Sequence, residues 1–303
     1  MTVRVLVNAL HAKSGGGVTY LRHILPRLAA DPELDVHLLL HPAQAALYPD
    51  AGVTVHHADF RAGFVREMAW EQCRLPRLAR RIGAAATFSP ANFGPLLAPG
   101  SVVLLRNALD VARVENRPAK RLYWAALSAM TFLSLVFCRR AIAVSGYARR
   151  SLARLPALAR KTVVVHHGVD DLFRGGPAGR REDFLLAVAD LYVQKNLLAL
   201  IDAVALLRQR RPDVRLRIAG APVDPGYAAS VRARIAEHRL DEAVTLLGTQ
   251  PKERLAELYR RCAVFVFPST VETFGQPLAE AMASGAPIAC ADAAAMPEVL
   301  GDA

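Results

Sequence analysis

Cysteine and lysine are scarce in this chain, and each shortage narrows its chemistry. The four cysteines, Cys73, Cys138, Cys262 and Cys290, are widely spaced, with no Cys-x-x-Cys pair and no neighbouring histidine. A structural zinc site is therefore not expected, and a reducing compartment fits. Only five of the 38 basic residues are lysine, so a lysine beside a sequence motif is less easily explained as an ordinary surface residue.

Several functional signals are also missing. Met1 is followed at once by a strand-like run, Val3 to Val7, so we expect no signal peptide and predict a cytoplasmic protein. The sequence has no Asp-x-Asp motif and no cluster of histidine with carboxylates, which disfavours metal-dependent chemistry. Arginine is not interleaved with aromatic residues as in a stacking groove, so nucleic acid is not an expected partner.

Short apolar runs alternate with helical patterns along the 303 residues. This order predicts parallel sheets with helices on both faces, and the length predicts two such domains. We therefore expect α/β architecture, with doubly wound, Rossmann-like domains over residues 1–168 and 182–303 and a glycine-rich linker over residues 169–181. The expected strands cover residues 3–8, 35–40, 53–57, 84–89, 101–105, 141–145, 162–166, 184–189, 214–219, 244–247, 264–267 and 287–290. In the first half, helices are expected near residues 18–30, 64–82, 119–138 and 147–155. Ligands of such domains bind in the cleft outside the carboxyl ends of the strands.

Charge is unevenly distributed along the sequence. Residues 1–170 contain 22 Lys and Arg against 10 Asp and Glu, whereas residues 171–303 contain 16 against 17. The first half is therefore expected to face an anionic membrane or glycan, unless its arginines only decorate a solvated face. Leu122 to Cys138 is an uncharged run bracketed by Lys120-Arg121 and Arg139-Arg140. We interpret it as a buried helix, with an interfacial membrane contact and a membrane span as the alternatives.

A glycine loop, His11-Ala-Lys-Ser-Gly-Gly-Gly-Val18, follows the first expected strand. Gly16 and Gly17 lack a Cβ, so the backbone can approach an anion closely with its N–H groups. The loop matches neither a GxGxxG fingerprint nor a P-loop, and a tight strand–helix turn is the alternative. His11 in this loop, like the pair His166-His167, is more often a hydrogen-bonding residue than a catalyst.

Two acidic residues, Glu272 and Glu280, stand eight apart between a strand pattern ending at Phe267 and a helical pattern from Leu278. A helix start attracts phosphate, and carboxylates accept hydrogen bonds from the hydroxyls of hexose and ribose. Lys195 opens another expected helix, where a cation opposes the helix dipole, so we expect it to bind a diphosphate. The alternatives are acids that only complement a dipole or lie on a surface, and a solvated lysine.

These residues resemble the retaining glycosyltransferases of group 1, also called family 4, which have GT-B architecture. The Glu-x7-Glu pair, Glu272 and Glu280, is that family's most specific signature. Supporting matches are HHGVD at residues 166–170, Lys195-Asn196 and MPEVLGDA at residues 296–303, and they occur in the family's order. The resemblance covers most of the second half, whereas the first half matches only in its glycine loop and general pattern.

The resemblance implies transfer of a hexosyl group from a nucleotide-diphosphate sugar to a glycan or lipid-linked acceptor in surface polysaccharide or glycolipid synthesis. The transfer would retain the anomeric configuration without a bound metal, and the nucleotide sugar would be a substrate, so no cofactor is expected. The second domain would hold the donor and the first domain the acceptor. Closure of the two domains would exclude water from the cleft.

Roles of single residues also follow from the resemblance. Lys195 would bind the donor diphosphate, Glu272 the hexose hydroxyls and Glu280 the ribose. Backbone amides of Phe274, Gly275 and Gln276 would contact sugar and phosphate. Gly16 and Gly17 would approach the phosphate from the other domain. Fixed amides together with Lys195 would stabilise the charge of the departing diphosphate.

The sequence departs from the family at three places. Asp190 and Gln194 stand where many members carry an arginine near the lysine, and Arg106 stands where many carry a histidine. We hypothesise that Arg106 supplies the missing cation and acts with Lys195 and Glu272. The sequence ends before the family's last elements, so we expect an incomplete second domain, in a fragment or a shortened member.

Two other functions fit the same pattern. One is a nucleotide-sugar epimerase of the same architecture, which needs no acceptor. The other is a non-catalytic, truncated member that binds a nucleotide. A peripheral position on the inner face of the cell membrane is a further expectation, based on the basic first half.

Overall fold

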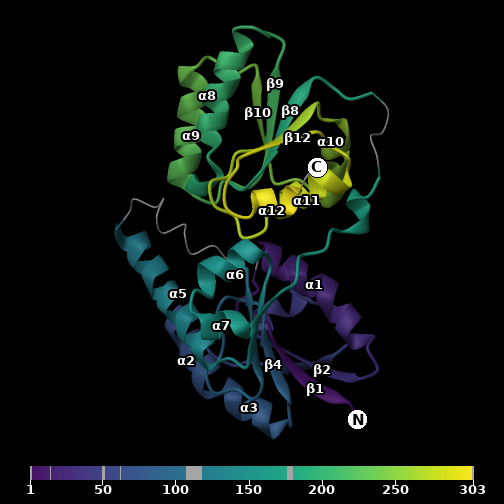
Figure 1. Cartoon of the computed structure of the whole chain (residues 1–303), viewed down its shortest axis with the longest axis vertical. Coiled ribbons are helices and arrows are strands. Elements are labelled where there is room, and N and C mark those ends of the chain that lie inside the picture. The colour runs from purple at the N-terminus through teal and green to yellow at the C-terminus, as the bar shows by residue number, and fades with distance from the viewer. Residues whose placement is uncertain are drawn as a thin grey trace. The chain divides into compact units, whose positions relative to one another are not determined.

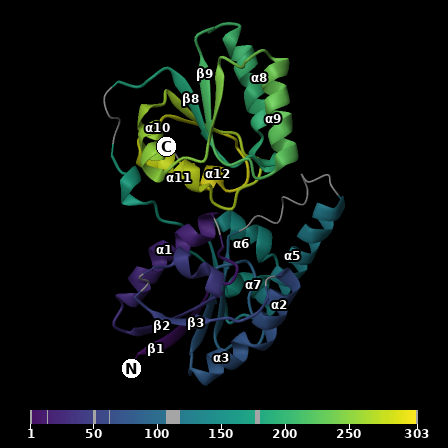
Figure 2. The ribbon, with the colours of Figure 1, turned by 180° about the vertical axis from the view of Figure 1, so that it is seen from behind.

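The computed structural model describes residues 2–13, 15–49, 52–61, 63–106, 118–175 and 180–301 of the chain. They form two compact units, shown from two sides in Figures 1 and 2. The N-terminal unit holds the described residues through Arg106 and Leu122–Val165. The C-terminal unit holds those from His166 onward and the first turn of helix α5, through Arg121.

The N-terminal unit is built on a seven-stranded parallel sheet with the strand order β3-β2-β1-β4-β5-β6-β7. The strands are β1 (Val3–Asn8), β2 (Leu34–Leu40), β3 (Thr54–His57), β4 (Ala86–Ser89), β5 (Ser101–Leu105), β6 (Arg140–Ala143) and β7 (Thr162–Val164). The helices are α1 (Gly15–Ala29), η1 (Pro42–Leu47), α2 (Phe64–Cys73), α3 (Leu75–Arg81), α5 (Pro118–Phe137), α6 (Gly146–Leu152) and α7 (Pro156–Arg160). In Figure 1, α1 lies on one side of the sheet and α2, α3 and α5 lie on the other.

The C-terminal unit is built on a five-stranded parallel sheet with the order β10-β9-β8-β11-β12. The strands are β8 (Phe184–Val188), β9 (Arg215–Ala219), β10 (Val244–Gly248), β11 (Val264–Phe267) and β12 (Ile288–Cys290). The helices are η2 (Asp171–Phe173), η3 (Val193–Lys195), α8 (Leu197–Arg208), α9 (Pro225–Glu237), α10 (Lys252–Arg261), α11 (Gln276–Ala283) and α12 (Met296–Leu300). Figure 1 shows α8 and α9 on one side of this sheet and α10 and α11 on the other.

Two apolar clusters hold the C-terminal sheet between its helices. One packs α8 and α9 against β8 and β9 through residues such as Leu200 and Val231. The other packs α10 and α11 against β8 and β11 and includes Tyr259 and Phe265. Helices therefore cover both faces of this sheet, and the doubly wound α/β prediction is confirmed for both units.

The segment predicted as a linker is partly described. Residues 171–173 form η2, whose Phe173 is 1 % exposed and packs in the C-terminal core. Residues 176–179 lie outside the described part of the chain, as does the end of the second domain at residues 302–303.

Two expectations about helices are wrong. The helix expected over Phe64 to Ile82 is interrupted at Arg74, because Pro76 in the next turn cannot continue the hydrogen-bond pattern of α2. Lys195 does not open a helix but ends the short turn η3, and Asn196 then adopts a left-handed backbone with φ of 52° before α8 begins. Asn tolerates this conformation better than most residues.

Helix α5 is not the buried helix expected from its uncharged sequence. Leu135 and Cys138 are buried, but Leu122 is 73 % exposed and Phe137 is 54 % exposed. Phe132, Leu133 and Val136 are exposed as well, so the helix has an apolar outer face. In the described part of the chain, no helix combines the length and the hydropathy needed to cross a bilayer.

Candidate functional site

The order of strands in the C-terminal sheet marks one position for a ligand. The chain runs from β8 outward through β9 and β10, and then returns to place β11 on the other side of β8. Loops that leave two such strands diverge above the carboxyl end of the sheet, and a crevice results. Lys195 follows β8 and Glu272 follows β11, so the fold brings together two residues that are 77 positions apart in sequence.

Lys195 and Glu272 form an ion pair at this position. The Lys195 Nζ donates a hydrogen bond to Glu272 Oε1. The side chains are 16 % and 15 % exposed, and the ammonium also lies 5.8 Å from the centre of the Phe267 ring. The lysine and the glutamate to which the sequence assigned different contacts thus pair with each other at the carboxyl edge of the sheet.

The backbone between the two glutamates is turned by Gly275. Its φ of 86° is in the left-handed region, and a Cβ there would lie 3.3 Å from the Phe267 ring, so glycine is required. Helix α11 begins at Gln276, and no hydrogen bond in the described part of the chain uses the N–H groups of Phe274, Gly275 and Gln276. Together with the positive end of the α11 dipole, these groups form a ready anion site.

Side chains of the same turn are fixed by the segment that opens the C-terminal unit. The ring of Phe274 is 6 % exposed and contacts His167 edge to face, with centroids 5.3 Å apart. Gln276 Nε2 donates a hydrogen bond to the carbonyl of Gly168 at 3.1 Å. His166 pairs with Glu298 of α12 at 3.2 Å. The histidine pair therefore helps to hold the turn in place.

Glu280 lies one turn inside α11 and is paired with a residue that sequence reasoning missed. Tyr259 of α10, fully buried, donates its hydroxyl to Glu280 Oε2 at 3.2 Å. Burial raises the pKa of Glu280 to about 7, although the Tyr259 hydrogen bond and the charge of Lys252 oppose this shift. Near neutral pH this carboxyl group therefore exchanges a proton easily.

Two further polar atoms at this edge were not predicted. Ser269 is 0 % exposed, and neither its Oγ nor the buried Gln194 Oε1 has a hydrogen-bond partner in the described part of the chain. Buried polar atoms are ordinarily satisfied, so both are candidates to contact a bound ligand. Asp190, at the other departure from the family, accepts a hydrogen bond from the Ala221 N–H at 2.8 Å and so stabilises the loop after β9.

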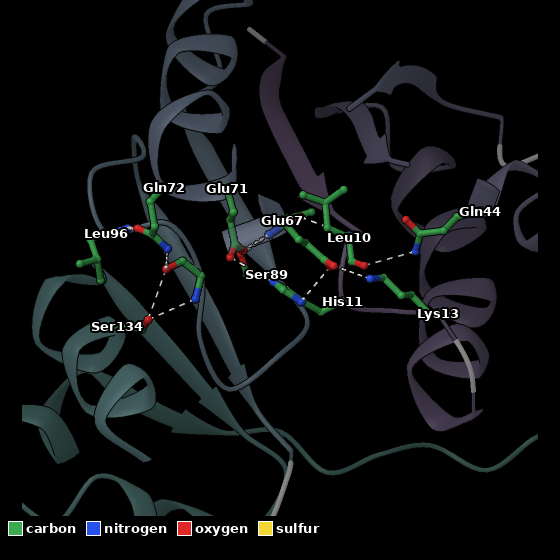
Figure 3. A network of polar contacts seen from close by, with 12 residues as sticks. Leu10, His11, Lys13, Gln44, Glu67, Glu71, Gln72, Ser89, Leu96 and Ser134 are labelled. Atoms are coloured by element: carbon green, nitrogen blue, oxygen red, sulfur yellow. Dashed lines mark hydrogen bonds and ion pairs between the residues drawn. The ribbon is translucent and has the colours of Figure 1, made fainter. Parts of the chain in front are cut away.

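The N-terminal unit has its own polar cluster at the corresponding edge (Figure 3). Its strand order reverses between β1 and β4, and Asn8 at the end of β1 bonds both Ser89 at the end of β4 and Glu71 of α2. Glu71 Oε2 lies 3.0 Å from His11 Nε2, and Glu67 Oε1 lies 3.2 Å from His11 Nδ1. Lys13 also binds Glu67.

The pKa of His11 is raised by this cluster. Burial disfavours the charge, but the hydrogen bond and the charges of Glu71 and Glu67 outweigh burial and raise the pKa of His11. Nε2 of the imidazolium would donate to Glu71 Oε2, while Glu67 Oε1 near Nδ1 contributes through its charge without a hydrogen bond. Glu67 and Glu71 are 3 % and 0 % exposed, and their spacing of four on α2 was the sequence signal that they share a face.

The glycine loop places its third glycine against Arg106. Gly15, Gly16 and Gly17 form the first turn of α1, and a Cβ at Gly17 would lie 2.8 Å from Arg106 Nη2. A Cβ at Gly16 would lie 4.0 Å from the same guanidinium group. Burial lowers the pKa of Arg106, with Tyr48 and Tyr20 opposing the shift. The predicted N-terminal residues thus meet one another, at the start of a helix.

The sequence of the C-terminal unit matches a known family. Residues 170–303 match the model of the family described as glycosyl transferases group 1. An O-antigen chain mannosyltransferase B of Escherichia coli is 34% identical over 127 residues, which is 40% of this chain and 32% of that protein. A D-inositol 3-phosphate glycosyltransferase of Mycobacterium sp. (strain KMS) is 35% identical over 151 residues, 46% of this chain and 34% of that protein. The chain thus spans about a third of the length of these curated relatives.

Solved structures extend the likeness to both units at the level of the fold. A glycosyltransferase of Rickettsia africae ESF-5 has a TM-score of 0.73 at 14% identity, covering 99% of this chain and 82% of that one. HepE of Anabaena in complex with UDP and glucose also has a TM-score of 0.73, at 19% identity, covering 98% of this chain and 82% of that one. The two parallel α/β units therefore have the fold of GT-B glycosyltransferases. The predicted resemblance of residues 170–303 to the group 1 glycosyltransferases is confirmed.

Proposed function

We propose that the protein transfers a hexosyl group from a nucleotide-diphosphate sugar to a glycan or lipid-linked acceptor in surface polysaccharide or glycolipid synthesis, with retention of the anomeric configuration and without a bound metal or cofactor. The observation that carries this proposal is the meeting of Lys195, Glu272 and the amides before α11 at the strand-order reversal. Relatives named as a mannosyltransferase and an inositol-phosphate glycosyltransferase support the class of reaction. HepE, solved with UDP and glucose, supports a nucleotide donor.

Each residue of the C-terminal set has a separable role in this proposal. The N–H groups of Gly275 and Gln276 and the Lys195 ammonium bind the diphosphate, which gains negative charge as the sugar departs. Glu272, once released by Lys195, accepts hydrogen bonds from sugar hydroxyls. Glu280 accepts hydrogen bonds from the ribose, best when its carboxyl group is ionised. Arg106, with Gly16 and Gly17, would add cationic and backbone contacts from the N-terminal unit.

A screen of nucleotide-diphosphate sugars tests the proposal directly. Thermal unfolding is measured with each sugar on the wild-type chain, on Glu280→Ala and on Glu253→Ala, whose exposed carboxylate in α10 provides the matched control. One donor should raise the melting temperature of the wild type and the control but not of Glu280→Ala. Equal shifts in all three proteins would remove Glu280 from the site.

Product analysis with the selected donor then assigns the reaction. The proposal is supported if a glycosidic linkage with the donor's anomeric configuration forms only when an acceptor is present. The same product should form when EDTA is added. A changed sugar without an acceptor indicates the epimerase. Donor binding without hydrolysis or transfer over a panel of acceptors indicates the non-catalytic member.

We further propose that α5 docks on an anionic membrane surface on the cytoplasmic side. Its outer face combines the exposed Leu122, Phe132 and Phe137 with the exposed basic residues Arg121 and Arg139 at its ends. An apolar face between basic ends is the pattern of helices that lie in the interface of anionic bilayers. A lipid-linked acceptor would be presented at the same surface.

Vesicle sedimentation distinguishes docking of α5 from non-specific attraction between a basic protein and an anionic membrane. Vesicles containing phosphatidylglycerol should sediment the wild type, and vesicles of phosphatidylcholine alone should sediment much less of it. Leu133→Ser, at a 46 % exposed position of α5, should reduce binding, while Leu206→Ser, at a 65 % exposed position of α8, should not. Equal binding of both variants would overturn the role of α5.

A further inference from the structure

A pocket in the N-terminal unit shares no residue with the polar cluster of His11 and Glu71. It occupies about 610 Å³ beside β3, the edge strand of the sheet, and is walled by α2 and α3. Sites for small molecules fall in the range of roughly 300–1,000 Å³. The pocket is therefore large enough for a ligand of the size of a sugar with a charged substituent.

Three arginines dominate the charge of this pocket. Arg74, Arg77 and Arg81 line it. Arg74 lies between α2 and α3, and Arg77 and Arg81, four residues apart, share one face of α3. In the described part of the chain none of the three guanidinium groups forms an ion pair with a carboxylate. Their one side-chain hydrogen bond there runs from Arg77 to the carbonyl of Cys73 at 3.1 Å. Asp59 is the one carboxylate in the lining.

A histidine of β3 also lines the pocket. His56 stacks on His37, with ring centroids 5.0 Å apart, and faces the pocket. Burial lowers the pKa of His56, and the charges of His37, Arg81 and His57 lower it further. The lining thus holds three guanidinium groups against the single carboxylate of Asp59, an excess of positive charge that an anionic ligand would balance.

One wall of the pocket is aromatic. Trp70 is partly exposed and packs on Phe60, with ring centroids 6.0 Å apart, so its ring is held in place. Leu78 lies in the same lining. A flat apolar wall suits the C–H face of a sugar ring, and the guanidinium forks suit the paired oxygens of a phosphate.

We propose that this pocket binds a phosphorylated saccharide, with the phosphate on Arg74, Arg77 and Arg81 and the sugar ring against Trp70. An inorganic phosphate alone would fill a small part of the volume and leave the aromatic wall in water. The site does not depend on transfer activity, so its failure would leave the proposed glycosyltransferase function untouched.

The emission of Trp70 tests this site in the whole chain. The sequence has two tryptophans, Trp70 and Trp124, so a Trp124→Phe background leaves Trp70 as the reporter. Glucose 6-phosphate, glucose and inorganic phosphate are titrated in turn. We expect a saturable change with glucose 6-phosphate, and an affinity at least tenfold lower for each of the other two probes.

Two arginine variants locate the binding. Arg77→Gln should weaken the affinity for glucose 6-phosphate at least tenfold, while Arg66→Gln, which removes an exposed arginine of α2 outside the pocket, should leave it unchanged. Thermal unfolding of both variants confirms that each remains folded. The absence of a saturable change, equal affinity in the two variants, or equal affinity for glucose 6-phosphate and inorganic phosphate would each overturn the proposal.

Discussion

The hydroxyl of Tyr259 and the carboxyl group of Glu280 lie 3.2 Å apart, with the tyrosine completely buried in the C-terminal core. The contact ties a residue of the Glu-x7-Glu motif to the packing of α10 against the sheet. Burial raises the pKa of Glu280 to about 7 and that of Tyr259 well above its ordinary value. Ionisation of Glu280 therefore lowers the stability of the folded protein as pH rises.

Replacement of Glu280 by glutamine should remove this cost. The pKa of Glu280 is raised from 4.5 to about 7 in the folded state, so ionisation opposes folding: the penalty is absent below pH 4.5 and complete above pH 7. The difference in unfolding free energy between Glu280→Gln and the wild type should shift in favour of the variant by up to about 3 kcal/mol from pH 5 to pH 8. Urea denaturation at both pH values measures the difference, and Glu253→Gln, with an exposed carboxylate, is the control. Parallel results for the two variants would show that Glu280 ionises normally.

The ion pair of Lys195 and Glu272 should show strong coupling. Lys195→Met leaves Glu272, 15 % exposed, without its cation, and Glu272→Gln leaves Lys195 without its anion. Each single variant should lose about 1–3 kcal/mol of unfolding free energy, and the double variant should lose much less than the sum. A double-mutant cycle by denaturation measures the coupling. Arg210→Ala, at an exposed residue after α8, is the neutral reference, and an additive cycle would contradict the pairing.

Donor binding should depend on the same pair in a different way. Because a diphosphate must take Lys195 from Glu272, Glu272→Gln frees the lysine and should preserve affinity for the nucleotide diphosphate alone while weakening the nucleotide sugar. Lys195→Met should weaken both ligands tenfold or more. Calorimetric titration with the two ligands separates these outcomes. A uniform loss in both variants would indicate that the pair only supports the fold.

Much of the architecture was readable from the sequence because a parallel strand covered on both faces is a short, continuous apolar run. All twelve expected strands are present. The helix break at Arg74 was missed although Pro76 marks it, because the apolar pattern continues through it. The exposed face of α5 was missed because a run without charges suggests burial on all sides, and the sequence does not show which face packs against the sheet.

Residues of the candidate site could be predicted from the sequence where they follow strands, but not where they lie within helices. Lys195 and Glu272 each stand just after a strand, so adjacent parallel strands bring them together. Tyr259 lies in α10, 21 residues before Glu280, and no local pattern connects them. Glu71 resembles an exposed helix acid in sequence, and only the fold shows that it is 0 % exposed beneath the glycine loop.

A methyl group at Gly17 should test the role of Arg106. The Cβ would lie 2.8 Å from Arg106 Nη2 and displace the guanidinium group, whereas the Cβ at Gly16 would lie 4.0 Å from it. If Arg106 contributes a cation, Gly17→Ala and Arg106→Ala should each reduce turnover about tenfold without adding to one another. Gly16→Ala leaves the guanidinium group in place and should gain up to about 1 kcal/mol of helix stability, as measured by denaturation. Unchanged donor affinity and turnover in Arg106→Ala would show that the cation hypothesis is wrong.

The pairing of His11 with Glu71 should make the N-terminal unit less stable as pH rises. The pKa of His11 is raised in the folded state, so the stabilisation is complete below about pH 6.5, the ordinary value, and is lost as pH passes through the higher folded value. His11→Asn leaves Glu67 and Glu71 buried, with Lys13 near only the first, and should cost about 3 kcal/mol at pH 6 and less at pH 8. Hydrogen exchange of β1 amides reports this unit alone. Glu33→Gln, at an exposed carboxylate, should keep the wild-type slope, and a wild-type slope in His11→Asn would mean that another group controls the pH dependence.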